Sequence, residues 1–546
     1  MEGRRAVTAP RGLITTPHAL ATDAGLRQLQ RGANAVEAAI AAAAVIAVVY
    51  PHMNGIGGDN FWLIFHARDR RVRALMACGA AGAGCTIEAY RAAGHQREIP
   101  RRGPLAANTV PGAVDGWWQA WEFSRDALDG RRPFAALLSD AVSQAKDGFP
   151  VSRGQGTWTR MNVGPDSGPF GHLEQFESFR RTFLRADGSP YSAGERFVVP
   201  GLAATMAEIA GGGRDAFYRG PIAAKVCEYL GARGGLLTAA DFAAHRGRWT
   251  DPIRCAYREW EVCNTPPPTQ GLTSLQILNI IGRFPIPAWG DESPDYYHTI
   301  VEATKEAFVD RDAWIADPDT RPVPVDDLLS SAHGQAQAVA IDPHRARSAA
   351  PARPAGRDTI WLGTIDGEGN AVSLIQSIAY DFGSGIVAEG TGVLLQNRGS
   401  AFSLDPKHHN ALAPGKRPFH TLNPAMALRD GRPALIYGAM GGEGQPQTQA
   451  AIATRVLDLG MDVQAAIDAP RWLYGRHWGV PTTKLQLEAR VPRTVLGELA
   501  ARGHDVQIIG AWDDRVGHAQ AIWVDPRTQV RHGGADPRAD GVAAGC

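Results

Sequence analysis

The sequence is poor in cysteine and carries no excess of charge of either sign. Six cysteines are spread over 546 residues, and their spacing matches neither a CxxC pair nor a zinc-binding template. Buried or free thiols in a reducing compartment are therefore expected, with no metal. Lysine plus arginine (56) equals aspartate plus glutamate (56). This balance gives no overall field that would attract nucleic acid or an anionic membrane, so a small-molecule partner is expected.

The sequence also lacks the spacing of a dinucleotide-binding loop. The Gly-rich stretch "NGIGGDN", residues 54–60, is not a GxGxxG motif and leads into a strand-like run rather than a helix. Its glycines are better explained by unusual backbone angles, or by close approach of the chain to a neighbouring group. We expect no cofactor.

No long apolar run is free of charge. The nearest is "ANAVEAAIAAAAVIAVVY", Ala33 to Tyr50, which contains Glu37 and is dominated by alanine. Alanine inserts weakly into membranes but has the highest helix propensity, so a helix buried by close neighbours is predicted. The N-terminus has basic residues without a following apolar run and cleavage site, so no signal peptide is expected. These features predict a cytoplasmic protein that does not enter the membrane.

The length and the pattern of apolar residues predict a layered α+β fold. At 546 residues the chain exceeds one ordinary core, so two lobes or one large layered fold are expected. The pattern is helical over about 114–250, and further helices are predicted near 447–468 and 493–502. "TIWLGTID" and "NAVSLIQSI" are strand-like runs separated by "GEG", which is typical of a hairpin. Stacked sheets covered by helices on the outside are therefore predicted.

The composition of the chain changes abruptly at the junction between Asp358 and Thr359. The tract "QAQAVAIDPHRARSAAPARPAGRD", residues 335–358, is crowded with alanine, arginine and proline, and Thr359 then opens a strand. If the bond between Asp358 and Thr359 breaks, the new N-terminal threonine carries a hydroxyl nucleophile and an α-amine whose pKa of about 7.7–8 lets it act as the base. The same hydroxyl can attack the preceding carbonyl and cut the chain. The tract would then be a flexible linker that is released; a threonine that merely begins a strand is the alternative.

Such chemistry needs backbone N–H groups that face the developing oxyanion. The best candidates are Gly441 and Gly442 in "YGAMGGEGQ". They follow a predicted strand and have no side chain to keep a substrate carbonyl away. A simple turn is the alternative explanation.

Several segments together resemble the γ-glutamyltransferase family of N-terminal-nucleophile hydrolases. They run in order from about residue 12 to 545 and include "NTVPGAVDGW", "TPPPTQG", "EATKEAFVDRDAWIADP", "DTIWLGTIDGEGNAVSLIQS" and "FGSGIVAEGTGVLLQN". The resemblance implies a four-layer αββα sandwich, made as a precursor and split before Thr359. A large subunit of residues 1–358 and a small subunit of 359–546 would result, with the nucleophile on the small one.

The resemblance also implies roles for further residues. Ser377 takes the place of the second hydroxyl, which hydrogen-bonds the nucleophile, and Gly441 and Gly442 take the place of the oxyanion-hole glycines. His420 and Thr421, in "KRPFHT", stand where paired serines usually line the acyl pocket.

The specificity residues depart from the family pattern. No arginine lies between Arg73 and Arg91, where the substrate α-carboxylate is usually clamped. The acidic pair that receives the α-amino group is replaced by "QNRGSAF", residues 396–402, so Arg398 enters this segment. Since each lost contact is worth about 1.5–3 kcal/mol when buried, a glutamyl head group should bind poorly. The residues expected to contact the substrate are Asn397, Arg398, His420 and Thr421.

These departures resemble the divergent branch of the family that includes cephalosporin acylases and oxamate amidohydrolase. The expected reaction is hydrolysis of a small acid amide, with oxamate as the best candidate, through an acyl-enzyme on Thr359. γ-Glutamyl transfer with a differently built clamp stays an alternative, and so does an unprocessed, non-catalytic protein. The two subunits of one precursor are expected to be partners, and a dimer of the processed heterodimer is left open.

Overall fold

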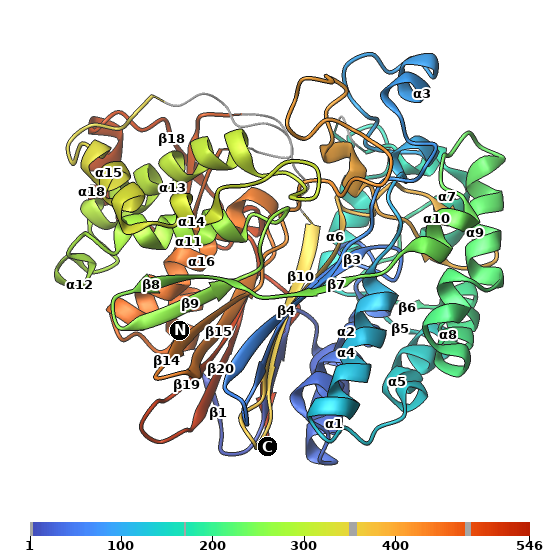
Figure 1. Ribbon diagram of the computed structural model, residues 1–546, viewed down its shortest axis with the longest axis horizontal. Coiled ribbons are helices and arrows are strands. Elements are labelled where there is room, and N and C mark those ends of the chain that lie inside the picture. Colours follow the sequence, from blue (N-terminus) through green and yellow to red (C-terminus); the bar gives the residue numbers. More distant parts are fainter. Residues whose placement is uncertain (1–3, 169–170, 349–357, 476–481) are drawn as a thin grey trace.

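Two large antiparallel sheets form the middle of the molecule (Figure 1). The computed structural model describes residues 4–168, 171–348, 358–475 and 482–546. The first sheet contains, in order, β1 (Val7–Ala9), β20 (Arg531–Ala535), β19 (Ala519–Val524), β15 (Arg432–Ala439), β14 (Ala425–Arg429), β9 (Trp260–Asn264) and β8 (Ile253–Tyr257). The second contains β21 (Val542–Gly545), β2 (Leu13–Thr16), β10 (Asp358–Ile365), β11 (Ala371–Ala379), β3 (Asp59–His66), β4 (Arg71–Ala77) and β7 (Arg248–Thr250). The predicted hairpin is formed by β10 and β11.

The two sheets pack face to face over an apolar core. β3 contributes Phe61, Leu63 and Phe65 to this core, at every second position, and β10 and β11 contribute Trp361 and Ile375. Alternate residues of a strand point to the same face of the sheet. These positions therefore mark which side chains of the three strands project between the sheets.

Helices cover the outer face of the second sheet. They include α1 (Ala19–Gln30), α2 (Ala35–Val49), α4 (Ala113–Ala127), α5 (Phe134–Asp147) and α8 (Pro200–Tyr218). Every residue of α2 is buried, and its one charged residue, Glu37, closes a capping box with Asn34 and accepts a hydrogen bond from the N–H of Arg132 at 2.7 Å. The prediction of a buried alanine-rich helix is confirmed. None of the described helices combines the length and the apolar character that crossing a bilayer requires.

A second helical layer covers the outer face of the first sheet. It includes α11 (Gly271–Ile281), α13 (Pro294–Trp314), α16 (Gln445–Ala453) and α17 (Val463–Asp468), which share a core with β14 and β15. The order helix, sheet, sheet, helix confirms the predicted four-layer αββα sandwich, and Figure 1 shows the two helical layers on opposite sides of the sheets.

Smaller elements connect these layers. The remaining helices are α3 (Ile87–Ala92), α6 (Arg153–Met161), α7 (Glu177–Phe183), α9 (Pro221–Gly231), α10 (Ala239–Ala244), α12 (Ile286–Trp289), α14 (Val325–Leu328), α15 (Ser331–Ala340) and α18 (Arg493–Ala501). The remaining strands are β5 (Phe149–Pro150), β6 (Arg196–Phe197), β12 (Val387–Ala388), β13 (Val393–Leu394), β16 (Trp472–Tyr474), β17 (Leu485–Glu488) and β18 (Val506–Ile509). All six cysteines are free thiols.

The junction before Thr359 is described in part. α15 runs to Ala340, because "QAQAVA" is a good helix-forming run, so the linker boundary predicted at residue 335 moves to a position after this helix. Residues 349–357 of the predicted linker lie outside the described residues. β10 begins at Asp358, so Asp358 and Thr359 lie in the same strand.

Candidate active site

Thr359 lies at a β-bulge near the start of β10. The register between β10 and β11 shifts between Asp358, which pairs with Ala379, and Ile360, which pairs with Gln376. β11 therefore places an extra residue opposite Thr359, and bulges of this kind re-aim side chains next to functional sites. Thr359 is 1% exposed, and its Oγ1 has no hydrogen-bond partner among the described residues. A buried hydroxyl without a partner is costly, which is typical of a group that a ligand or a reaction uses.

Three neighbouring strands place polar side chains in one row. Asp59 of β3 pairs directly with Ser377 of β11, and Thr359 lies in β10 on the other side of β11. The residues two positions deeper in each strand belong to the core between the sheets. Because side chains alternate along a strand, Asp59, Ser377 and Thr359 also project between the sheets, at one end of this core.

Arg398 supplies a positive charge to this row. It is 1% exposed; its Nη2 donates to Ser377 Oγ at 3.0 Å and its Nη1 donates to Thr421 Oγ1 at 3.1 Å, while Nε has no partner. Among the described residues, no carboxylate lies within ion-pair distance of its guanidinium. Burial lowers the pKa of Arg398 to about 10, against the opposing effect of Asp59. Arg398 is therefore not a surface arginine, and a buried cation without an ion-paired carboxylate among the described residues points to a place for an anion.

Asp59 is a buried carboxyl group with one free oxygen. Its Oδ1 accepts backbone N–H groups of Gly79 at 3.2 Å and of Gly112 at 2.9 Å, whereas Oδ2 has no partner among the described residues. Burial raises the pKa of Asp59 to about 7, although Arg398 acts to lower it. We did not predict this residue from the sequence. The signal was available, because Asp59 continues the inward-facing positions of β3 at 61, 63 and 65.

His420 and Thr421 lie against the same row. His420 is fully buried, with its ring edge-on to Phe61, and neither of its ring nitrogens has a hydrogen-bond partner among the described residues. Burial, together with the charge of Arg398, holds the pKa of His420 well below its usual range, so the ring is neutral. Its Nε2 lies 3.7 Å from Asp59 Oδ2. The structure therefore brings Arg398, His420 and Thr421 together, and their contact with a substrate stays a prediction.

Gly441 and Gly442 follow β15, the strand that ends at Ala439. Both have positive φ, +137° and +55°, which glycine adopts without strain. The side chain of Gln270 donates from Nε2 to the carbonyl of Gly442 and to the carbonyl of Thr421, at 2.7 Å in both cases. Gln270 thus ties the glycine pair to the segment that Arg398 contacts. Its segment, "TPPPTQG", contributed to the family resemblance, but no role for Gln270 was predicted from the sequence.

The glycines of "NGIGGDN" permit the close approach that was predicted. A Cβ on Gly58 would collide with the carbonyl of Ser377, and one on Gly57 would collide with the carbonyl of Leu394. The start of β3 is therefore pressed against β11 beside Ser377. This contact fixes the position of Asp59 relative to Ser377.

The side chain of Asn397 hydrogen-bonds to the backbone around it. Its Oδ1 accepts from the N–H of Tyr380 at 3.1 Å, and its Nδ2 donates to the carbonyl of Arg101 at 2.7 Å. These contacts hold the loop that delivers Arg398. The amide of Asn397 positions its neighbour, and a contact with substrate stays a prediction.

A cavity of about 290 Å³ adjoins the site through two of its loops. Its lining includes Ser400 and Phe402, which follow Arg398, and Glu443, which follows Gly442. Arg101, Arg311 and His409 also line it. Thr359, Ser377 and Arg398 are not in this lining. We refer to Asp59, Thr359, Ser377, Arg398, His420 and Thr421 as the strand-end cluster.

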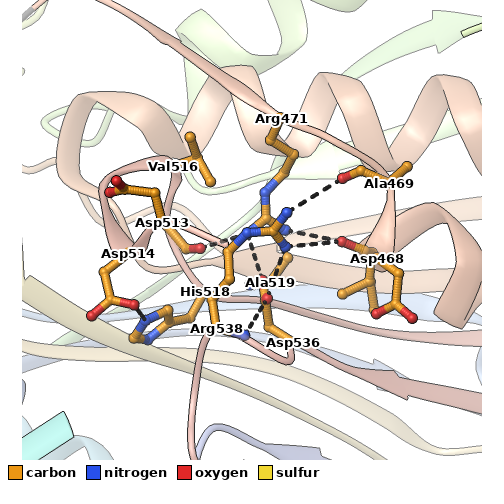
Figure 2. A network of polar contacts seen from close by, with 12 residues as sticks. Asp468, Ala469, Arg471, Asp513, Asp514, Val516, His518, Ala519, Asp536 and Arg538 are labelled. Carbon is orange, nitrogen blue, oxygen red and sulfur yellow. Dashed lines mark hydrogen bonds and ion pairs between the residues drawn. The ribbon is translucent and has the colours of Figure 1, made fainter. Parts of the chain in front are cut away.

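A second group of buried charges lies close to Gly441, and each of its charged side chains has an ion-pair partner; Figure 2 labels Arg471, Asp536 and Arg538 of this group. This paired network consists of Arg471, Glu488, Asp536 and Arg538. Arg471 Nη2 donates to Asp536 Oδ2 at 2.5 Å, and Arg538 donates to Asp536 Oδ1 at 3.0 Å and to both oxygens of Glu488 at 2.7 and 2.5 Å. Burial alone would raise the pKa of Asp536, but Arg471 and Arg538 hold it well below its usual range.

The paired network fixes the chain that supports Gly441. Arg471 Nη2 also donates to the carbonyl of Gly517 at 2.5 Å, and Asp536 Oδ2 accepts the N–H of Ala519 at 2.7 Å. Between these two contacts, the carbonyl of His518 accepts the N–H of Met440 at 2.9 Å. The network therefore holds the backbone next to the candidate oxyanion hole.

A possible metal-binding group lies away from the strand-end cluster. His298, Glu302 and His504 bring potential ligand atoms within 4.8 Å of one another. His298 Nδ1 hydrogen-bonds His504 Nε2 at 2.9 Å, and Glu302 Oε1 accepts from Lys305 Nζ at 2.6 Å. Hydrogen bonds and a neighbouring lysine therefore account for this group without an ion.

Comparison with known proteins places the chain in a family. A family model described as Gamma-glutamyltranspeptidase matches residues 21–546. The chain is 46% identical to the oxamate amidohydrolase proenzyme of Klebsiella pneumoniae, over 98% of both chains. It is 42% identical to the glutathione hydrolase-like YwrD proenzyme of Bacillus subtilis, over 99% of both.

Solved structures agree with this assignment. The cephalosporin acylase from Bacillus halodurans superposes with a TM-score of 0.89 and 36% sequence identity, over 100% of this chain and 97% of the other. The match extends across both sheets and both helical layers. The chain therefore belongs to the γ-glutamyltranspeptidase family.

Proposed function

We propose that this protein is an amidohydrolase that cleaves a small amide bearing a carboxylate, with oxamate as the best candidate. Thr359, released as an N-terminus by cleavage after Asp358, is the nucleophile of the proposed reaction. Arg398 binds the carboxylate of the substrate, Ser377 orients the nucleophile, and Gly441 and Gly442 supply N–H groups to the oxyanion. Residues 1–358 and 359–546 become the two subunits.

The observation that carries this proposal is the state of Arg398. Its guanidinium is buried and is hydrogen-bonded to two neutral hydroxyls, with no carboxylate partner among the described residues. One of these hydroxyls belongs to Ser377, next to Thr359 in the sheet. A small anion that contacts Arg398 would therefore have its neighbouring carbonyl within reach of the nucleophile. An amide with a carboxylate close to the scissile carbonyl satisfies this geometry.

The chemistry follows from an N-terminal threonine. Thr359 Oγ attacks the amide carbonyl while the α-amine takes its proton, and the N–H groups of the glycine pair stabilise the oxyanion. The intermediate collapses, the α-ammonium gives a proton to the departing nitrogen, and ammonia leaves. Water, deprotonated by the same amine, then attacks the ester on Thr359 and releases the acid. For oxamate the products are oxalate and ammonia.

The relatives support the reaction class more directly than the substrate. The relative from Klebsiella pneumoniae is an oxamate amidohydrolase proenzyme, and the structural relative from Bacillus halodurans is a cephalosporin acylase. Both names describe hydrolysis at an amide, and the first also names a precursor. The choice of oxamate rests on that name together with the unpaired Arg398.

A direct assay tests the proposal. Purified protein should run as two bands on a denaturing gel, with Thr359 at the N-terminus of the smaller one, and should release ammonia from oxamate. Thr359→Ala should give one full-length band and no ammonia. A wild-type protein that is processed but inactive on oxamate would refute the substrate, and an active Thr359→Ala variant would refute the mechanism.

γ-Glutamyl transfer is the second candidate, and Asp59 is the observation that favours it. An ionised Asp59 beside Arg398 would present opposite charges to the ammonium and the carboxylate of a glutamyl head group. The relative from Bacillus subtilis is named glutathione hydrolase-like. Turnover of a γ-glutamyl anilide at a higher kcat/KM than oxamate would favour this candidate.

A further inference from the structure

Asp59 has a role that the proposed reaction leaves open. Its Oδ1 accepts two backbone N–H groups, so a proton on that oxygen would compete with these hydrogen bonds. Oδ2 has no partner among the described residues, and it is the oxygen on which a proton would reside. A protonated Asp59 would therefore present an O–H donor at a defined position.

Three residues of the strand-end cluster that neighbour Ser377 each carry an atom without a partner among the described residues. Ser377 pairs with Asp59 across the two strands and accepts from Arg398 at 3.0 Å, so Asp59 and Arg398 flank one serine. Asp59 Oδ2, Arg398 Nε and Thr359 Oγ1 all lack partners among the described residues. One carboxyl oxygen, one guanidinium N–H and one hydroxyl, on three residues that neighbour Ser377, are thus left without hydrogen bonds to the described residues. A bound carboxylate next to a carbonyl would use all three.

We infer that Asp59 determines specificity for anionic substrates by binding the substrate carboxylate in its protonated form, through a hydrogen bond from Oδ2–H, while Arg398 provides the opposite charge. This inference rests on the proposed function, since it concerns the same site. No bond other than the O–H of Asp59 forms or breaks in this step. The proton comes from solvent and returns to solvent when the anion leaves.

The side chains around Asp59 keep one charge state near pH 7, so among them only Asp59 is expected to gain or lose a proton. The charged and titratable groups that face it are Arg398, His420, Cys78 and Tyr218. Burial raises the pKa of the Cys78 thiol and of the Tyr218 hydroxyl, and burial lowers that of His420, so these three stay neutral near pH 7. The amide of Gln396 also faces Asp59 and acts to lower the pKa of its carboxyl group.

The sign of the pH effect follows from electrostatics. Burial raises the pKa of free Asp59 to about 7, and a bound carboxylate adds a negative charge that raises it further. The complex then holds more protons than the free protein. Binding of an anion should weaken as pH rises above the pKa of free Asp59, by up to about tenfold per pH unit. A glutamyl head group, whose ammonium needs an ionised Asp59, should show the opposite sign.

Kinetics on the processed enzyme test this inference. We expect KM for oxamate to rise more steeply with pH above about pH 7 in the wild type than in Asp59→Asn. The asparagine amide keeps the shape of a protonated carboxyl group and a donor. An α-amine ordinarily has a pKa of about 7.7–8 and is present in both processed proteins, so its contribution is removed by taking the difference between their pH slopes. Equal pH slopes of KM in the two proteins would overturn the inference.

Calorimetry with oxalate makes the test independent of turnover. Titration in two buffers of different ionisation enthalpy measures protons taken up on binding. We expect net uptake near pH 7 for the wild type and less uptake for Asp59→Asn. Oxalate binding without proton uptake would overturn the inference even if oxamate is hydrolysed. Proton-linked oxalate binding by a protein that does not hydrolyse oxamate would support the role of Asp59 and refute the proposed reaction.

Two controls keep the outcome interpretable. A denaturing gel shows whether Asp59→Asn is processed; if it is not, proton uptake is compared between Thr359→Ala and the double variant Thr359→Ala/Asp59→Asn, which are both uncut, and equal uptake would overturn the inference. Arg398→Gln removes the charge that attracts the anion, and it should weaken oxalate binding at every pH. Unchanged oxalate affinity in Arg398→Gln would place the anion elsewhere and would also overturn the inference.

Discussion

Two groups of buried charges in this protein differ in whether each charge has a partner. In the paired network, Asp536 and Glu488 meet two guanidinium groups, and each carboxylate oxygen accepts at least one hydrogen bond. In the strand-end cluster, Arg398 and Asp59 are equally buried but do not form an ion pair, and neither is paired with a group of opposite charge among the described residues. Pairing offsets much of the cost of burying charge, so the first group is accommodated in the fold without a ligand. The second group remains costly until something binds, which is what a ligand site requires.

The largest expected effect is on the nucleophile of the unpaired group. Thr359→Ala removes the hydroxyl that both the cleavage and the hydrolysis need, so activity should fall by more than roughly 10⁴-fold. A gel and an ammonia assay measure the two losses. Thr364→Ala, at another threonine of β10 whose hydroxyl bonds the carbonyl of Ala35, is a matched control and should be processed and active. Loss of processing in both variants would mean that β10 is merely destabilised.

The same substitution in the two groups should have opposite effects on stability. Asp536→Asn leaves Arg471 and Arg538 without their shared carboxylate, which should cost about 3–5 kcal/mol of unfolding free energy. Asp59→Asn removes a buried carboxylate that has no ion-pair partner at hydrogen-bond distance among the described residues. At pH 8 it should leave stability unchanged or raise it. Denaturant unfolding at that pH compares the two, and a large loss in Asp59→Asn would erase the distinction between the groups.

Arg398→Gln should separate binding from stability. Loss of a charge-assisted contact with the substrate carboxylate should raise KM for oxamate by about 10–100-fold, equivalent to about 1.5–3 kcal/mol. The unfolding free energy should not fall, since Arg398 has no carboxylate partner among the described residues. Arg471→Gln is the matched substitution in the paired network, and it should instead destabilise the protein. A stability loss of equal size in both variants would count against Arg398 as a binding residue.

The smallest effect is the pH dependence of stability. The folded-state pKa of Asp59, about 7, lies above its unfolded value of 3.8. The folded protein therefore binds more protons than the unfolded chain between these values, and the contribution of Asp59 to stability is lost as pH rises through that window. Asp536, whose pKa is held low, has the opposite sign and loses its contribution as pH falls. The unfolding free energy of the wild type minus that of Asp59→Asn should decrease from about pH 4 to about pH 7.

Some of the site was predictable residue by residue. The change of texture at Asp358–Thr359 and the Gly441–Gly442 pair after a strand are local patterns, and the structure puts both at strand ends. Arg398 could be singled out because it replaces an acidic pair in a recognisable segment. Its environment could not be predicted, because an arginine in a loop is exposed or buried according to what packs over it.

Asp59 and Gln270 were missed for a related reason. Asp59 is one charge at the start of an apolar strand, and Gln270 is one amide after a proline-rich turn. Neither pattern shows that Asp59 will pair with Ser377, or that Gln270 will join Thr421 to Gly442. These contacts connect residues more than 150 positions apart, and they exist only in the folded chain.

By itself, the sequence determined the elements and the layers, because apolar periodicity along a helix or strand decides which face is buried. It also determined the order of hydroxyl, glycine and charged residues along the chain. Tertiary structure decided which buried charges meet and which do not. Arg471 and Asp536 are held close enough to neutralise each other, whereas Arg398 and Asp59 are held apart on either side of Ser377. The physical reason is that the cost of a buried charge depends on distances across strands and loops, which no local pattern contains.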